Sequence, residues 1–150
     1  MLGADIIVNT DGDNQYPGNR IPDLIKPILE GRAEVVVGNR NPGSNPHFTP
    51  FKRLLQRLGN HVVSFVAGEK LPDSVSGFRA YSREALYEIN VTSRFSYVVD
   101  TLIQVYKKGL AIAWVDIETH APTRPSRLFR NIWEHIGKTT MNIGRVYMLY

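Results

Sequence analysis

Two carboxylates separated by a single glycine follow directly on an apolar run near the start of the chain. They are Asp11 and Asp13, and the run is ADIIVNT at residues 4–10. A strand that ends in paired acids places negative charge where α/β proteins usually bind a ligand. Hard divalent cations prefer carboxylate oxygens, and a bound cation can bridge the oxygens of a diphosphate. The pair therefore favours a divalent-metal site for a nucleotide diphosphate.

Two other interpretations of DGDNQYP, residues 11–17, compete with this one. A helix-loop-helix calcium loop needs glycine at its sixth position and glutamate at its twelfth, where this chain has Tyr16 and Pro22. That interpretation is excluded. A turn in which Asp and Asn side chains cap backbone amides remains an alternative, because short acidic pairs are common by chance.

The elements that must position these acids follow from the apolar periodicity, which alternates between strand and helix spacing. Strands are predicted at 4–10, at 34–38, within 71–82 and at 111–119, and helices at 21–29, 51–66, 83–89, 97–108 and 128–147. The continuous run EVVVG at 34–38 indicates a strand buried on both faces. The fold class is therefore α/β, with a mostly parallel sheet, flanking helices and a long amphipathic helix at the end.

Composition limits the classes of protein that fit. The 150 residues are 43% hydrophobic and 21% charged, which suits one domain with its own core. The absence of cysteine excludes disulfides and thiolate metal sites, and the four histidines show no paired ligand spacing. A net charge of +4 favours a nucleotide, a lipid phosphate or an anionic membrane as partner, and no nucleic acid is expected. Without a spanning segment or signal layout, we expect a cytoplasmic protein, which an anionic membrane as partner would place at the cytoplasmic face of a membrane.

Three motifs in a fixed order carry a resemblance to a known family. DGDNQYP is followed by EVVVGNR at 34–40 and by DSVSGFRAYSREAL at 73–86. In this order the chain resembles the family 2 glycosyltransferases of the GT-A fold, in the branch of dolichyl-phosphate mannose synthase and related polyprenyl-phosphate sugar transferases. The resemblance implies a partial, Rossmann-like GT-A fold. Residues 1–150 would form the carboxyl-terminal portion of a single catalytic domain whose amino-terminal half is absent.

The resemblance implies a donor site built from the first two motifs. Asp11 and Asp13 match the family's Asp-x-Asp, which binds Mg²⁺ or Mn²⁺ and the donor diphosphate. Gln15 matches a polar position that completes the metal shell. Arg40, in Gly-Asn-Arg, matches the arginine that meets phosphate.

The third motif supplies two further candidates for the chemistry, Asp73 and Arg79. Asp73 is the first candidate for a catalytic carboxylate, either as general base or to orient the acceptor, and its alternative is a turn residue capping Ser76. The second candidate for this carboxylate is Asp100, which lies outside the motif in the predicted helix at 97–108. Arg79 stands within a strand-like run, where an arginine normally needs an anionic partner; the donor phosphate or a structural carboxylate would serve.

Acceptor binding is implied by basic residues later in the chain. The resemblance implies that the acceptor phosphate is bound by Arg53, Arg124 and Arg127. The amphipathic segment that contains Arg127 and Arg130 suggests a peripheral membrane contact, with packing against the sheet as its alternative.

The activity implied by the resemblance is metal-assisted, inverting transfer of a sugar from a nucleotide-sugar donor to a polyprenyl phosphate or glycan acceptor. Fixed cations beside the departing diphosphate would lower the barrier directly. The isolated chain is expected to be an incomplete or inactive hexosyltransferase. Two alternatives stay open, a truncated non-catalytic module of such an enzyme and a sugar-phosphate nucleotidyltransferase, which also uses acids on a comparable sheet.

Overall fold

The computed structural model describes residues 3–43, 49–91 and 97–121. Within these ranges the elements follow one another as β1 (Ile6–Asn9), the short 3-10 helix η1 (Gly18–Arg20), α1 (Ile21–Leu29), β2 (Val35–Asn39), α2 (Pro50–Ala67), β3 (Arg79–Ser82), α3 (Arg83–Glu88), α4 (Tyr97–Lys107) and β4 (Ile112–Asp116). The predicted strands and helices up to residue 119 are confirmed, with ends that differ by a few residues. The predicted helix at 128–147 lies outside the described residues.

The described sheet is mixed. Its strand order is β1-β3-β2-β4; β3 pairs antiparallel with both β1 and β2, and β2 pairs parallel with β4. The prediction of mostly parallel pairing is therefore wrong, because a continuous apolar run reports burial on both faces and not the direction of the neighbouring strand. The strands β1, β2 and β4 nevertheless run in the same direction. Their carboxyl ends meet at one edge of the sheet, together with the start of β3.

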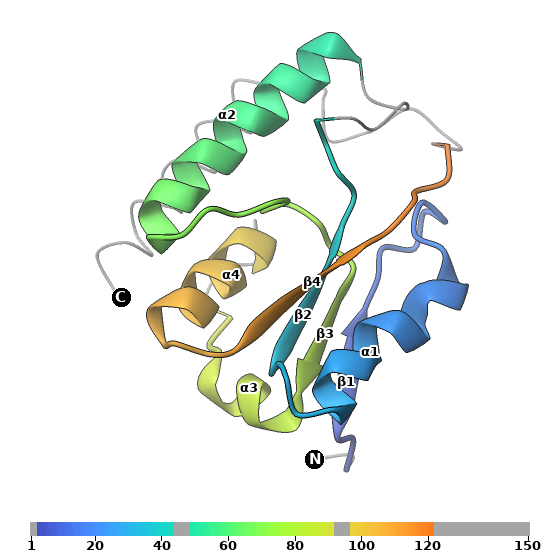
Figure 1. Ribbon diagram of the computed structural model, residues 1–150, viewed down its shortest axis with the longest axis vertical. Helices are drawn as coiled ribbons and strands as arrows, with labels where there is room; N and C mark the ends of the chain where they lie inside the picture. The colour runs from blue at the N-terminus through green and yellow to red at the C-terminus, as the bar shows by residue number, and fades with distance from the viewer. Residues whose placement is uncertain (1–2, 44–48, 92–96, 122–150) are drawn as a thin grey trace.

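Helices cover both faces of this sheet (Figure 1). The helix α1 lies on one face, and α4 lies on the other with α2 packed outside it (Figure 1). The side chains of β2 alternate accordingly: Val36 packs in the cluster that contains Leu24 of α1, while Val35 and Val37 belong to the cluster on the α4 side. The strand is thus buried on both faces, as its composition predicts.

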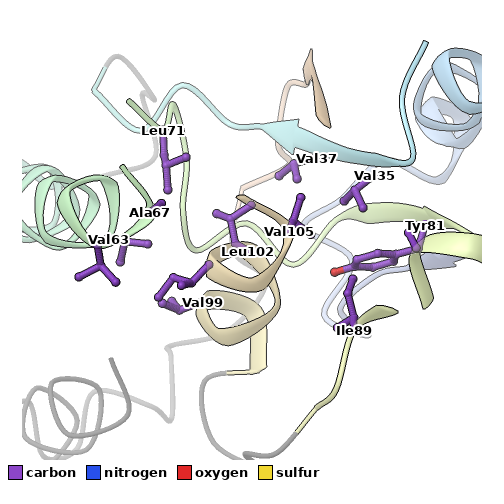
Figure 2. Close-up of a cluster of buried hydrophobic side chains, with 13 residues drawn as sticks. Val35, Val37, Val63, Ala67, Leu71, Tyr81, Ile89, Val99, Leu102 and Val105 are labelled. Carbon is purple, nitrogen blue, oxygen red and sulfur yellow. The ribbon is translucent and has the colours of Figure 1, made fainter. Parts of the chain in front are cut away.

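The cluster on the α4 side holds three layers together (Figure 2). Leu102 and Val105 of α4 lie between the β2 valines and α2 (Figure 2). From α2, Val63, Val66 and Ala67 close the cluster. The inner face of α2 is therefore fixed through α4.

Local sequence signals set the limits of α2. The Thr49 hydroxyl accepts a hydrogen bond from the Lys52 backbone N–H at 3.2 Å, and Pro50 occupies the first turn, where its missing N–H costs nothing. Gly68, with φ of 80°, ends the helix in the left-handed region that suits glycine. Within the described ranges, no helix is long and apolar enough to span a membrane.

Truncating Leu102 tests the importance of this cluster. Leu102→Ala leaves a cavity between α4 and its neighbours, and we expect the free energy of unfolding to fall by about 2–5 kcal/mol. The matched control is Leu29→Ala, whose side chain is 71% exposed and should change stability by no more than about 0.5 kcal/mol. Urea unfolding followed by circular dichroism measures both, and equal losses in the two variants would contradict the assignment.

Candidate functional site

Each of the three strands that run in the same direction, β1, β2 and β4, ends at a polar residue. The Asn39 amide donates to an Asp116 carboxylate oxygen at 2.6 Å, which links the ends of β2 and β4. At the end of β1, the Asn9 amide donates to the Tyr97 hydroxyl at 2.8 Å. The strand ends thus form a polar edge, which is where open α/β sheets bind ligands.

The turn with the paired acids leaves this edge directly after β1. An Asp13 carboxylate oxygen accepts from the Gln15 backbone N–H at 3.1 Å, and Asn14 adopts the left-handed conformation with φ of 60°. The capping role weighed for this turn is therefore confirmed for Asp13. Such a cap fixes the direction of the carboxylate, which a preorganised ligand site also requires.

The Asp11 carboxylate lies directly against Gly77. A Cβ atom at position 77 would stand 2.9 Å from one Asp11 carboxylate oxygen and 3.1 Å from the other, so a side chain there would displace the carboxylate from its present position. The Gly77 N–H donates to the Tyr16 hydroxyl at 3.1 Å, and the Tyr16 ring stacks on Phe78 at 5.2 Å between ring centroids. The segment around Gly77 therefore forms the wall of the acidic turn.

This contact shifts the protonation of the acid. Partial burial raises the pKa of Asp11 above its usual value, the negative charge of Asp13 raises it further, and the charge of Arg40 opposes both. Asp11 as a residue is exposed, so the effect comes from shielding of the carboxylate at Gly77 and not from enclosure in the core. Two carboxylates that repel each other in a half-shielded turn favour a bound cation.

Arg40 and Asp73 form a two-pronged ion pair. Nε of Arg40 donates to one Asp73 carboxylate oxygen at 2.7 Å, and a terminal nitrogen donates to the other at 2.8 Å. Burial opposes the charge on Arg40, but the hydrogen bonds and charge of Asp73 outweigh it and raise the pKa of Arg40. The Asp73 side chain is fully buried. In this structure both carboxylate oxygens of Asp73 bind the Arg40 guanidinium. The phosphate-binding role of Arg40 and the catalytic role of Asp73 stay predictions.

Arg79 is almost fully buried, and the partners of its guanidinium are neutral oxygens. It donates to the carbonyls of Ser74, Ser76 and Val98 and to the Thr101 hydroxyl, at 2.6–3.2 Å. Among the described residues, these four neutral oxygens take the place of the structural carboxylate that was one of the two expected partners. Its predicted role as a donor-phosphate ligand is untested, and the burial of the guanidinium argues against it.

The remaining predicted residues divide between this site and other places. Arg53 lies in the first turns of α2 and is partly buried, while Gln15 stands in the acidic turn. Asp100 is buried in α4 and accepts from the Gln104 amide at 2.7 Å, which suits a structural role. Arg124 and Arg127 lie outside the described residues.

The sequence analysis did not predict two of the residues that contact the acidic turn and its wall, Tyr16 and His120. The sequence analysis assigns Tyr16 no role in the site, although an aromatic residue within a polar turn is a signal for one. His120 shows no paired ligand spacing in the sequence, yet its backbone N–H donates to the Gln15 carbonyl at 2.9 Å and its Nδ1 lies 3.1 Å from the Asn14 carbonyl oxygen. No sequence spacing connects residues 14 and 120, so only the fold reveals this contact.

The acidic turn suits a metal that shares its ligands with substrate. In the ranges that the structure describes, no three His, Cys, Asp or Glu side chains are grouped so that they could hold a metal ion by themselves. Magnesium-type ions are commonly bound by one or two carboxylates, with water and substrate phosphates completing the shell. Asp11 and Asp13 fit that arrangement, and Gln15 could add an amide oxygen.

The fold, with its acidic turn at the polar edge of the sheet, belongs to one class of α/β protein. This is the class of the GT-A glycosyltransferase structures. Glucosyl-3-phosphoglycerate synthase from Mycobacterium tuberculosis, solved with phosphoglyceric acid, is similar to this chain with a TM-score of 0.69 and 20% identity. The match covers 97% of this chain and 49% of that protein. A second structure of the same enzyme, with Mn²⁺, UDP and glucosyl-3-phosphoglycerate, also gives a TM-score of 0.69 and 20% identity over 96% of this chain and 48% of that one.

The chain belongs to glycosyl transferase family 2, whose family model matches residues 2–89. It is 35% identical to UDP-N-acetylglucosamine--dolichyl-phosphate N-acetylglucosaminyltransferase of Methanococcus voltae, over 79% of this chain and 49% of the relative. It is 32% identical to a dolichyl-phosphate hexose transferase of Haloferax volcanii, over 75% of this chain and 49% of that protein. The chain therefore spans about half the length of these relatives.

The shifted acid gives a prediction about pH. Because the folded state raises the pKa of Asp11, it holds that proton more tightly than the unfolded chain, and stability falls as pH rises from 3.8 through the raised pKa. Asp11→Asn should therefore be more stable than the wild type at pH 7 and lose this advantage below pH 3.8. Urea unfolding across this range measures the difference. Glu118→Gln, which removes the same charge at an exposed position, should not reproduce it.

The ion pair gives a second prediction. Asp73→Ala leaves the Arg40 guanidinium largely buried beside a cavity, and we expect a loss of about 3–5 kcal/mol in the free energy of unfolding. Replacing both partners, as in Arg40→Met with Asp73→Leu, should cost less than the single change, because no buried charge is left unpaired. A double variant that is less stable than Asp73→Ala would show that the pair does not account for the loss.

Proposed function

We propose that this chain carries the metal-binding part of an inverting glycosyltransferase, which transfers a sugar from a nucleotide donor to a polyprenyl phosphate. The observation that carries the proposal is the placement of Asp11 and Asp13 at the carboxyl end of β1, with Asp11 half-shielded against Gly77. The membership of family 2 supports it. Residues 1–150 would then form the carboxyl-terminal portion of one catalytic domain.

On the donor side, departure of the nucleotide diphosphate builds negative charge that must be neutralised. A divalent cation held by Asp11, Asp13 and Gln15 would supply this neutralisation as a Lewis acid. The Mn²⁺ and UDP in the similar M. tuberculosis enzyme support a divalent cation at this site. Arg40 adds a fixed positive charge close enough to act on Asp11.

On the acceptor side, the engagement of Asp73 favours a phosphate nucleophile. Both Asp73 carboxylate oxygens accept from Arg40, and the side chain is fully buried, so it is poorly placed to take a proton from a hydroxyl acceptor. A phosphate anion needs no strong base. The names of the relatives, which specify dolichyl phosphate, agree with this choice.

The cations proposed for the acceptor phosphate are Arg53, Arg124 and Arg127. Arg79 has a different role: it positions the segment 73–78 through the carbonyls of Ser74 and Ser76. A lipid acceptor places the protein at a membrane, and we propose its cytoplasmic face.

Calorimetry with UDP and GDP tests the donor site. With Mn²⁺ or Mg²⁺ present, we expect binding of at least one nucleotide that weakens about tenfold or more in Asp13→Ala, because the metal loses a carboxylate ligand. Asp23→Ala is the matched control, since Asp23 is a half-exposed carboxylate on α1. Nucleotide binding that is independent of metal, or equal in both variants, would contradict the metal site.

Transfer of labelled sugar to a short-chain polyprenyl phosphate tests the reaction itself. Metal-dependent nucleotide binding without any transfer would favour the non-catalytic module over the enzyme. Release of pyrophosphate from a sugar phosphate and a nucleoside triphosphate would instead favour the nucleotidyltransferase.

A further inference from the structure

The end of β4 is joined to the end of β2 in two ways. The backbones pair in the parallel ladder, where Asn39 lies opposite Asp116 and the Ile117 N–H donates to the Asn39 carbonyl at 2.9 Å. In addition, the Asn39 side-chain amide donates to an Asp116 carboxylate oxygen at 2.6 Å. The ladder by itself fixes the register of the two strands. The side-chain bond therefore serves something other than strand pairing.

The Asn39 side chain directs the chain as it leaves β2. Its amide nitrogen also donates to the Asn41 side-chain oxygen at 2.8 Å, and its own oxygen accepts from the Asn41 backbone N–H at 3.0 Å. Asn41 has a φ of 48°, in the left-handed region that residues other than glycine seldom adopt. The buried Asn39 amide thus uses both of its N–H groups and its oxygen, which gives it a single orientation.

Arg40 stands between these two asparagines, so the bonds of Asn39 fix the backbone from which its side chain leaves. The Arg40 backbone N–H donates to an Asp73 carboxylate oxygen at 3.2 Å, and the guanidinium bonds the same carboxylate. Burial and the charge of Asp13 raise the pKa of Asp11, while the charge of Arg40 opposes them, so Arg40 lies within electrostatic reach of the acidic turn. A cation and paired acids that act on one diphosphate must be held at a fixed separation.

The segment that begins with Asp116 contacts the acidic turn as well. The Arg20 guanidinium, just after that turn, donates to the Asp116 carbonyl at 2.9 Å. Further along, the His120 backbone N–H donates to the Gln15 carbonyl at 2.9 Å. Residues 116–120 therefore lie against both parts of the candidate donor site, the acidic turn and the start of the loop after β2.

We propose that Asp116 is a positioning residue of the donor site, whose carboxylate orients Asn39 and thereby holds Arg40 at a fixed distance from the acidic turn. The assignment rests on the proposed function, because a shared diphosphate is what makes this distance matter. Asp116 acts through its neighbours and does not touch the donor. Such outer partners of ligand-binding groups commonly decide how well those groups are oriented.

The NMR signal of the Arg40 Nε–H group tests the assignment without any ligand. Asp116→Ala removes the acceptor of the Asn39 amide, and we expect the Arg40 Nε–H to exchange faster with water and its chemical shift to move. Asp116→Asn keeps an acceptor oxygen and should restore the wild-type signal. Glu118→Ala, which removes an exposed carboxylate from the same segment, should leave the signal unchanged.

Calorimetry of UDP and GDP with Mn²⁺ measures the consequence for the donor site. Binding should weaken about tenfold in Asp116→Ala and stay close to the wild type in Asp116→Asn and in Glu118→Ala. Asn39→Asp sets two carboxylates against each other and should also weaken binding. Combining Asn39→Asp with Asp116→Asn restores a donor opposite an acceptor, so affinity should recover in part. Urea unfolding of every variant separates these effects from a loss of stability.

Three results would overturn the assignment. One is an Arg40 signal in Asp116→Ala that matches the wild type. Another is a changed signal with unchanged nucleotide affinity, which would confine Asp116 to the joining of β2 and β4. The third is binding by Asp116→Asn as weak as that by Asp116→Ala, which would make the carboxylate a direct ligand. Wild-type chain that binds neither nucleotide contradicts the proposed function, whereas the Arg40 signal still decides whether Asp116 positions that arginine.

Discussion

Two buried guanidinium groups hold the segment 73–78 in place, and the acidic turn depends on that segment. Arg40 holds its start through the Asp73 carboxylate, and Arg79 holds its middle through the Ser74 and Ser76 carbonyls. Between these anchors, Gly77 meets the Asp11 carboxylate. Arginine suits both positions because its planar, permanently charged fork can bond several oxygens at once. The segment is thus a wall held by side-chain hydrogen bonds, although it contains neither helix nor strand.

The wall has an energetic consequence for the acids. The turn keeps Asp11 close to Asp13 and shields its carboxylate from water, both of which disfavour the charged form. Such an arrangement is unfavourable for stability and persists because the surrounding contacts over-determine it. Tyr16 contributes by bonding Gly77 and stacking on Phe78. Because the two carboxylates destabilise the turn when no cation is bound, a bound cation would stabilise it. The local instability therefore agrees with a metal-binding role.

The sequence predicted the elements and the acidic turn well because both depend on local information. Apolar periodicity identified α2 within one residue at each end, and the run before Asp11 identified β1. The direction of strand pairing was predicted wrongly. The strand β3 lies between β1 and β2 and runs antiparallel to both, and its four residues carry no signal of that direction. The partners of Arg79 were also missed: backbone carbonyls carry no sequence signature, whereas carboxylates do. His120 shows the same limit, since its contact joins residues 106 positions apart.

The helix α4 connects the wall to the outer surface of the molecule. Its first turns supply the Val98 carbonyl and the Thr101 hydroxyl that bind Arg79. One position further along, Leu102 packs in the cluster that fixes the inner face of α2. A shift of α2 would therefore be transmitted to α4, and from α4 to the guanidinium that positions Gly77, because close-packed interiors do not absorb displacement locally. The segment 73–78 is thus contacted from two helices, by α4 through Arg79 and by α2 through the Asn60 amide oxygen, which accepts from the Ser74 backbone N–H at 2.7 Å.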